Sequence, residues 1–350
     1  MKMKKALALV LAALLLVSMA ACTGTAPAAT TAATTAAAAE TAAAAETEAT
    51  EASAETESGK TYTVGICQLV QHPALDAATQ GFKDALTEAL GDAVSFNEQN
   101  ASGESVNCAT IINGFVASNV DLIMANATPA LTAATSATAD IPILGTSVTD
   151  YASALEIDNW TGTVGTNVAG TSDLAPLDEQ AAMLQELFPD AKKVGLLYCS
   201  AESNSKYQVD VIKGYLEAAG LTCAEYAFTD TNDVASVTQK ACDDSDVIYI
   251  PTDNTAASNT EAIANVLVPA GVPAICGEEG ICKGCGVATL SISYYDLGVT
   301  TGKMAAKILT GEADISTMPI EFTTATPKYN ASMCETLGIT PREGYTAIAE

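Results

Sequence analysis

Short apolar runs alternate with longer amphipathic runs along most of the chain, from residue 61 onward. In the first half, the pattern predicts strands at residues 61–69, 94–97, 120–125, 141–145 and 162–168. Segments with helical spacing of apolar residues separate the first four strands, at residues 74–90, 105–118 and 129–139. Strands that alternate with helices of this length predict a parallel sheet with helices on both faces.

The second half repeats this plan from residue 192. It has predicted strands at residues 194–199, 222–228, 247–250, 274–276 and 287–292, and predicted helices at 206–219, 234–242 and 256–268. Each half opens with a Val-Gly pair, at Val64 and Val194. The repetition predicts an α/β fold of two doubly wound parallel-sheet lobes with a cleft between them. Neither half contains a GxGxxG or Walker motif, so binding of nucleotide phosphates has no support.

The amino-terminal residues predict export. Residues 1–5 are positively charged, residues 6–17 are apolar, and two alanines precede Cys22, so residues 1–21 have the pattern of a signal peptide. The run Ser-Met-Ala-Ala-Cys that ends at Cys22 resembles a bacterial lipobox, in which the Cys is lipidated; ordinary secretion is the alternative. Residues 22–60 are almost wholly Ala, Thr, Glu and Ser, which predicts a disordered tether.

Charge and cysteine content exclude several kinds of partner. The formal net charge of −27 argues against nucleic acid and against adsorption to anionic lipid. Ten cysteines would suggest disulfides in an exported protein. If Cys22 is lipidated, an odd number remains and at least one is unpaired. The single CxxC motif, at Cys282 and Cys285, has no evident fourth metal ligand, and His72 is the only histidine. We therefore predict no metal and no cofactor.

Polar side chains gather where the predicted strands end. Those we expect at a shared site are Gln68, Thr128, Ser147, Asp150, Asp173, Glu202, Asn204, Asp253, Asn254 and Glu278. Each alone is more typical of a helix cap or turn than of a ligand contact. His72, before Pro73, is likewise more typical of a helix entry than of proton chemistry. In doubly wound lobes, however, these loops emerge at one sheet edge, and two facing edges form a polar concave site.

The charges of these loops favour one class of ligand. No Lys or Arg occurs among them, and Arg342 is the only Arg of the chain. Phosphates and dicarboxylates are usually held by a bidentate Arg, so such ligands are disfavoured. A single carboxylate can still be held at a helix start, as near Thr128. An ammonium group or sugar-like hydroxyls suit the acids of these loops, which are Asp150, Asp173, Asp253 and Glu278. The loops favour a zwitterion or a neutral polar molecule.

Five longer motifs occur in order: GICQLVQHPALDAATQGFKDAL, VGLLYCSAESNS, IPTDN, AICGEEG and SYYDLGVTTGKMAAKILTGE. With this spacing they resemble the substrate-binding lipoproteins of ABC transporters whose characterised members include tryptophan and tyrosine binders, over Tyr62 to Thr340. The resemblance implies a type I periplasmic-binding-protein fold with three hinge crossovers. The first lobe would comprise residues 61–172 plus about 293–318, and the second residues 173–292 plus about 319–350. All the loop residues named above except Asp150 would line the ligand cleft.

The resemblance also implies a function. The protein would be the extracytoplasmic solute-binding component of an ABC import system, lipid-anchored to the cell membrane at Cys22. It would capture a small polar or zwitterionic ligand, an amino acid or more narrowly an aromatic one, by hinge closure. A permease with a cytoplasmic ATPase would receive the ligand. A nucleoside or sugar on the same fold, and sensing without transport, stay open as alternatives. The residues show no activated Ser or Cys with a His partner, so we predict no enzymatic activity. We also expect a monomer.

Overall fold

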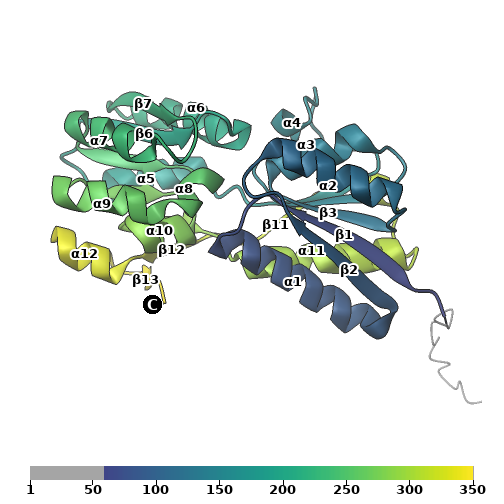
Figure 1. Ribbon diagram of the computed structural model, residues 1–350. Coiled ribbons are helices and arrows are strands. Elements are labelled where there is room, and N and C mark those ends of the chain that lie inside the picture. Colours follow the sequence, from purple (N-terminus) through teal and green to yellow (C-terminus); the bar gives the residue numbers. More distant parts are fainter. Residues whose placement is uncertain (1–58, 350) are drawn as a thin grey trace, which may run out of the picture. The chain divides into compact units, whose positions relative to one another are not determined.

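The computed structural model describes residues 59–349, so the predicted signal peptide, Cys22 and nearly all of the predicted tether lie outside the described residues. The described residues form two α/β lobes, each built on one sheet (Figure 1). Nearly all neighbouring strands in both sheets are parallel, which confirms the fold class predicted from the alternation of strands and helices.

The first lobe has a six-stranded sheet in the order β11-β5-β4-β3-β1-β2. Its strands are β1 (Tyr62–Gln68), β2 (Val94–Asn100), β3 (Leu122–Asn126), β4 (Ile143–Val148), β5 (Val168–Ser172) and β11 (Ile320–Phe322). Its helices are α1 (Pro73–Leu90), α2 (Ser105–Ala117), α3 (Thr128–Ala137), α4 (Tyr151–Ala154) and α11 (Tyr294–Leu309).

Helices cover both faces of this sheet because β1 is apolar on both sides. Val64 and Ile66 point to one face and pack with Phe82 of α1. Cys67 points to the other face and packs with Phe115 of α2. Successive side chains of a strand alternate in direction, so a continuous apolar run of this kind is what a sheet buried on both faces requires.

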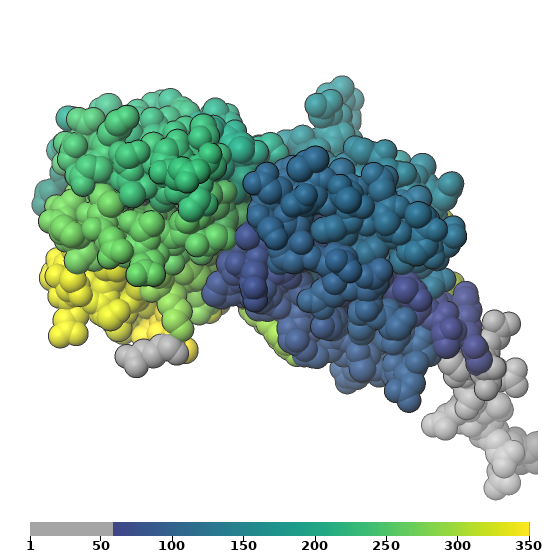
Figure 2. Space-filling model, in the orientation of Figure 1, coloured from purple at the N-terminus to yellow at the C-terminus, as the bar shows by residue number. Residues whose placement is uncertain are grey.

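The second lobe has a seven-stranded sheet in the order β13-β12-β10-β9-β8-β6-β7, in which only the β10–β12 pair is antiparallel. Its strands are β6 (Lys193–Cys199), β7 (Thr222–Phe228), β8 (Val247–Ile250), β9 (Ala274–Cys276), β10 (Ala288–Ser291), β12 (Thr326–Tyr329) and β13 (Thr346–Ala347). Its helices are α5 (Leu177–Leu187), α6 (Ser203–Ala218), α7 (Val234–Asp244), α8 (Asn254–Ser258), α9 (Thr260–Ala270), α10 (Glu279–Cys285) and α12 (Ala331–Leu337). Figure 2 shows the yellow carboxyl-terminal residues on the green surface of this lobe.

Three segments carry the chain between the two sheets, and we call them the hinge: residues 173–176, 292–293 and 323–325. The second crossing returns the chain to the first lobe, where α11 packs along α1 (Figure 1). The last crossing comes slightly later than the boundary expected near residue 319. Because β11 pairs with β5, residues 320–322 belong to the first sheet.

The predicted strand at residues 162–168 is wrong. The strand of this region is β5, which begins at Val168, and residues 162–167 precede it as an irregular segment. The sequence of β5 is Val-Ala-Gly-Thr-Ser, in which Ala and Gly weaken the preference for a strand that Val and Thr provide. Pairing with β4 on one side and β11 on the other stabilises it, and neither contact is readable from the local sequence.

The cysteines of the described segment are all free thiols, and all but Cys223 are buried. Cys67, Cys199 and Cys276 are fully enclosed in strands, as expected for cysteines that serve as small apolar residues. Between residues 59 and 349 no group of three or more His, Cys, Asp or Glu side chains is arranged to hold a metal ion. None of the helices in that segment has the length and apolarity needed to span a membrane.

Candidate functional site

A small cavity lies where the strand ends of the two lobes face each other. Six of the residues predicted for the site line it: Ser147, Asp173, Asn204, Asp253, Asn254 and Glu278. The remaining lining residues are His72, Leu75, Thr149, Thr252, Ala257 and Tyr294. Both lobes therefore contribute to one polar cavity, as parallel sheets with facing carboxyl ends require. Its free volume is about 10 Å³, roughly the space of one water molecule.

Two predicted residues lie elsewhere because their side chains have partners inside the first lobe. The amide nitrogen of Gln68 donates to the backbone oxygen of Val70 (2.9 Å) and to Asp76 (2.7 Å), and its oxygen accepts from Thr79 (2.6 Å). Asp150 caps α4 by accepting from the backbone N–H of Ser153 (2.7 Å). Neither side chain lines the cavity. The expectation that Gln68 contacts ligand is not supported by this placement, because its amide is already used to fix the start of α1.

Thr128 also lies outside the cavity lining. Its hydroxyl is buried and has no hydrogen-bond partner among the described residues. It occupies the first position of α3, after Ala127, whose φ of +94° is unusual for a residue other than glycine.

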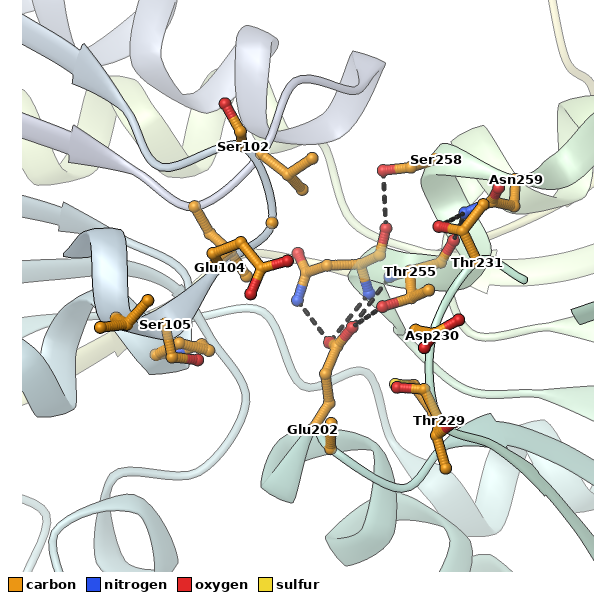
Figure 3. Close-up of a pocket in the computed structure, with 18 residues that line it drawn as sticks. Ser102, Glu104, Ser105, Glu202, Thr229, Asp230, Thr231, Thr255, Ser258 and Asn259 are labelled. Atoms are coloured by element: carbon orange, nitrogen blue, oxygen red, sulfur yellow. Dashed lines mark hydrogen bonds between the residues drawn. The ribbon is translucent and has the colours of Figure 1, made fainter. Parts of the chain in front are cut away.

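Glu202 serves as an anchor for the start of α8 rather than as a wall of the cavity. Its carboxylate accepts from the backbone N–H groups of Asn254 (3.0 Å) and Thr255 (2.8 Å). It also accepts from the side chains of the same two residues, at 2.7 and 2.8 Å (Figure 3). A carboxylate at a helix start satisfies N–H groups that have no partner within the helix and complements the helix dipole.

A wider groove adjoins the cavity and shares Asn254 with it. Ser102 and Glu104 border the groove from the first lobe, whereas Asp230 and Thr255 border it from the second (Figure 3). In this view Glu104 points from the first lobe toward the side of the groove where Glu202 lies. The groove thus lies between the same two lobes as the cavity.

Three carboxyl groups in the cavity have partners that hold them in place. Asp173 accepts from the hydroxyls of Thr149 (3.2 Å) and Tyr294 (2.9 Å). Asp253 accepts from the backbone N–H groups of Cys199 (2.7 Å) and Ala256 (2.8 Å). Glu278 caps α10 by accepting from the backbone N–H groups of residues 280 and 281. The lobes thus hold these carboxyl groups rigidly, while each oxygen keeps acceptor capacity for a further donor.

Burial raises the pKa of all three groups, to about 6 for Asp173 and to about 7 for Asp253 and Glu278. Desolvation is the main cause, since a buried carboxylate loses the water that stabilises its charge. The neighbouring charge of Glu202 raises the pKa of Asp253 further. Within the described chain the cavity lining contains no Lys or Arg. The site is therefore suited to a cation or to neutral hydrogen-bond donors.

Three polar atoms in the cavity are buried and have no hydrogen-bond partner among the described residues. They are Nδ1 of His72, Oγ of Ser147 and Oδ1 of Asn204. Ser147 moreover has a φ of +53°, a conformation that costs energy for a residue other than glycine. A buried polar atom without a partner is unfavourable by about 1–3 kcal/mol. These atoms belong to residues of both lobes that line one cavity, where a ligand can satisfy them.

The sequence did not reveal two of the residues that line the cavity. His72 precedes α1, as its place before Pro73 predicts, but its Nε2 also lies 3.2 Å from Oδ1 of Asn254, which is in the other lobe. Tyr294 begins α11, directly after the second hinge crossing, and its hydroxyl binds Asp173 at the first crossing. Both contacts join residues far apart in the sequence. The one available signal was the placement of Tyr294 beside a crossover.

The described residues have marked similarity to one protein family. The family described as "ABC transporter substrate binding protein" matches residues 63–350. A protein of Clostridioides difficile (strain R20291) named tyrosine-binding protein is 35% identical over 261 residues, which are 74% of this chain and 75% of that protein.

Two solved structures extend the similarity to three dimensions. A domain from Streptococcus pneumoniae in complex with L-Trp is 33% identical and has a TM-score of 0.78, with coverage of 83% of this chain and 100% of that one. The ligand-free, open structure of a substrate binding protein with adhesive properties from Clostridium difficile is 35% identical, with a TM-score of 0.64 and coverage of 82% and 99%. The fold here thus superposes better on the complex than on the open structure, although the latter is slightly closer in sequence.

Proposed function

The chain belongs to the family of ABC transporter substrate-binding proteins, and on that premise we propose that it captures an aromatic amino acid for import. The ligand binds in the cavity between the lobes. Its ammonium group faces the buried carboxyl groups, and its carboxylate accepts from hydroxyl and backbone N–H donors, among them the free hydroxyl of Ser147. No bond of the ligand is broken, and the protein acts as a receptor and not as an enzyme.

The observation that carries this proposal is the set of buried atoms without partners at Ser147, Asn204 and His72. A role as helix caps does not explain these atoms, because a capping atom has a hydrogen bond to the helix and these atoms have no hydrogen-bond partner among the described residues. Their position beside the carboxyl groups, in a lining without Lys or Arg, favours a ligand that brings a cation and further donors. The names of the tyrosine-binding relative and of the L-Trp complex support an aromatic amino acid in particular.

Hinge closure is the proposed mechanism. A cavity of about 10 Å³ is too small for an amino acid, so the lobes separate to admit the ligand and close over it. Ligand contacts from both lobes then favour the closed state over the open one. The three hinge crossings allow this motion without unfolding either sheet, and the two lobes follow the boundaries described above.

Delivery completes the proposed function. The closed receptor docks as a monomer on an ABC permease, whose cytoplasmic ATPase drives uptake. We propose that Cys22 carries the lipid that anchors the receptor outside the cell membrane, on the lipobox-like sequence before it. A Cys22→Ser variant should then leave the membrane fraction, whereas retention equal to that of the unmodified chain would exclude the anchor.

The direct test of ligand class is a thermal-shift screen of the full chain against aromatic and aliphatic amino acids, nucleosides and sugars. A ligand at 100 times its dissociation constant stabilises the folded state by ~2.7 kcal/mol. We expect the largest shift with L-tyrosine or L-tryptophan. A shift given only by nucleosides or sugars would reject the amino acid while keeping the receptor. If the protein binds a ligand that the cells do not import, a sensory role is favoured.

A pair of adjacent glutamates supplies a matched control for the site. Glu278→Gln keeps the length of the side chain and one of its two acceptors for the α10 cap but removes a charge from the cavity. We expect it to weaken amino acid binding roughly 10- to 150-fold, the cost of losing a charged hydrogen bond. Glu279→Gln changes the next residue, which pairs with Lys328 outside the cavity, and should alter affinity less than about twofold. Calorimetric titration measures both, and equal effects would place the ligand elsewhere.

A further inference from the structure

We infer that His72 sets the specificity of the site, by accepting a hydrogen bond at Nδ1 from the side-chain donor of the bound aromatic ligand. That donor is the phenol O–H of a tyrosine or the indole N–H of a tryptophan. The inference rests on the proposed function and deepens it, since it names the residue that separates these ligands from an aromatic ring without a donor, such as phenylalanine.

The orientation of Asn254 determines which nitrogen of His72 carries the proton. Glu202 can only accept, so the group of Asn254 that lies 2.7 Å from it is the amide nitrogen. The amide oxygen of Asn254 then faces His72, at 3.2 Å from Nε2. An amide oxygen can only accept, so Nε2 is the donor. The second lobe thereby fixes the tautomer of a histidine that belongs to the first lobe.

The imidazole is neutral in this setting. Burial lowers the pKa of His72, and this outweighs the opposing effects of the Asn254 hydrogen bond and of the negative charges of Glu202 and Asp76. With the proton on Nε2, a neutral ring carries a lone pair on Nδ1. That nitrogen is buried, belongs to a residue that lines the cavity, and has no partner among the described residues. Nδ1 is therefore an acceptor that a donor on the ligand can satisfy.

Two contacts lie at different sides of the cavity and decide what part of the ligand His72 meets. At the hinge end, the hydroxyl of Tyr294 donates to Asp173 at 2.9 Å. His72 instead contacts Asn254 of the second lobe, at 3.2 Å. Leu75, one turn along α1 from His72, adds apolar lining at this end. The ammonium group belongs at the hinge end, and the aromatic side chain belongs beside His72.

The bond between His72 and Asn254 also joins the lobes. Of the side-chain hydrogen bonds among residues 59–349, it alone links a loop of the first sheet to a loop of the second away from the hinge. His72 therefore has two separable roles, one at each nitrogen. Nε2 links the two lobes, and Nδ1 accepts the hydrogen bond from the ligand side chain.

Two substitutions of His72 test these roles separately, because the Gln and Asn side chains differ in length. In His72→Gln the amide group reaches the position of Nε2 and can still donate to Asn254, but nothing replaces the Nδ1 acceptor. In His72→Asn the shorter amide places an acceptor near the position of Nδ1 but cannot reach Asn254. Calorimetric titrations of the full-length protein with L-tyrosine, L-tryptophan and L-phenylalanine then report the contribution of each nitrogen.

The unmodified chain should bind tyrosine or tryptophan more tightly than phenylalanine. His72→Gln should weaken binding of the preferred ligand by roughly fivefold to 100-fold, the cost of an unmatched buried donor. Phenylalanine should change less than about threefold, so the preference disappears. His72→Asn should keep the preference while weakening all three ligands together, because the contact between the lobes is lost.

Two results would overturn the inference while leaving the proposed function intact. One is an unmodified chain that binds phenylalanine as tightly as the other two ligands. The other is a preference that survives in His72→Gln, which would reduce His72 to its contact with Asn254. If the unmodified chain binds none of the aromatic amino acids, the proposed function and the inference both fail. Circular dichroism of each variant identifies any loss of fold.

Discussion

The carboxyl groups of Asp173, Asp253 and Glu278 make the stability of the ligand-free protein depend on pH. Their pKa values in the folded state, about 6 to about 7, lie above the ordinary values of such groups. The folded protein therefore binds protons that the unfolded chain releases, and stability is lost as the pH rises from about 4 through about 7. A pKa difference of one unit corresponds to about 1.4 kcal/mol.

We therefore predict a lower unfolding temperature for the ligand-free protein at pH 8 than at pH 5.5. Asp253→Asn keeps an acceptor for the α8 cap, although the N–H of Cys199 loses its own, and should reduce this dependence. Asp314→Asn is the matched control, since Asp314 is an exposed cap that accepts from Ser316 at 2.9 Å. Calorimetric scans across this range check both variants. The assignment fails if Asp253→Asn leaves the pH dependence of the parent unchanged.

Ligand affinity should show the opposite trend. An ammonium group binds a carboxylate better than a carboxylic acid, so affinity for an amino acid should rise between pH 5.5 and pH 8, with release of protons on binding. Titrations in buffers of different ionisation enthalpy measure that release. Binding that is tighter at pH 5.5 would argue that the ligand approaches these groups as an acceptor.

The sequence predicted residues that line the cavity where local and long-range signals coincide. Asp173, Asp253 and Glu278 follow strands, and the position of a strand end is set by the apolar pattern itself. Gln68 also ends a strand, but its amide turns back toward Asp76 and Thr79 on α1. The residues next to Gln68 do not predict this orientation of its amide. The residues next to His72 likewise do not predict its contact with the other lobe.

At the scale of elements, the contact between α1 and α11 ties the second hinge crossing to the first lobe. Small residues let the two helix backbones approach closely. A Cβ at Gly298 would collide with the backbone oxygen of Ala78, and one at Gly81 would collide with that of Tyr295. Side chains of other residues do not fit here, since both obstacles are backbone atoms.

We predict that Gly298→Ala destabilises the protein by about 1–3 kcal/mol, the usual cost of overpacking. Gly114→Ala on α2 is its control, because a Cβ there meets nothing within 4 Å. That change should be neutral or stabilising by up to about 1 kcal/mol, since alanine favours helix over glycine. Urea unfolding measures both. Equal effects of the two substitutions would contradict the close approach of α1 and α11.

Element limits were readable for much of the second half. Predicted and observed limits agree within a few residues for β6, α6, β7, α7, β8 and β9, but the single helix predicted at residues 256–268 is divided into α8 and α9. Prediction failed for β5, and it gave no element for the long helices α5 and α11 or for the short helices α10 and α12. The short elements depend on tertiary contacts, such as those of Asn330 before α12, whose amide nitrogen donates to the backbone oxygens of Cys282 and Lys283 (both 2.9 Å).

At the scale of the molecule, the number of lobes followed from the repeated plan, but their exact division did not. The return of the chain at residues 320–322 depends on pairing between β11 and β5, which are about 150 residues apart in the sequence. The same long-range closure creates the cavity, since Asp173 at one crossing contacts Tyr294 at another. The cavity is thus a property of the assembled lobes and not of any one segment.

Closure around the ligand is the central claim, and small-angle X-ray scattering during a titration tests it most directly. The full-length protein is measured with increasing L-tyrosine or L-tryptophan, and Glu278→Gln is measured beside it at the same concentrations. We predict that the radius of gyration of the parent falls and saturates at one ligand per chain, whereas the variant needs a higher concentration for the same fall. Saturable binding of either amino acid with an unchanged radius of gyration would contradict closure.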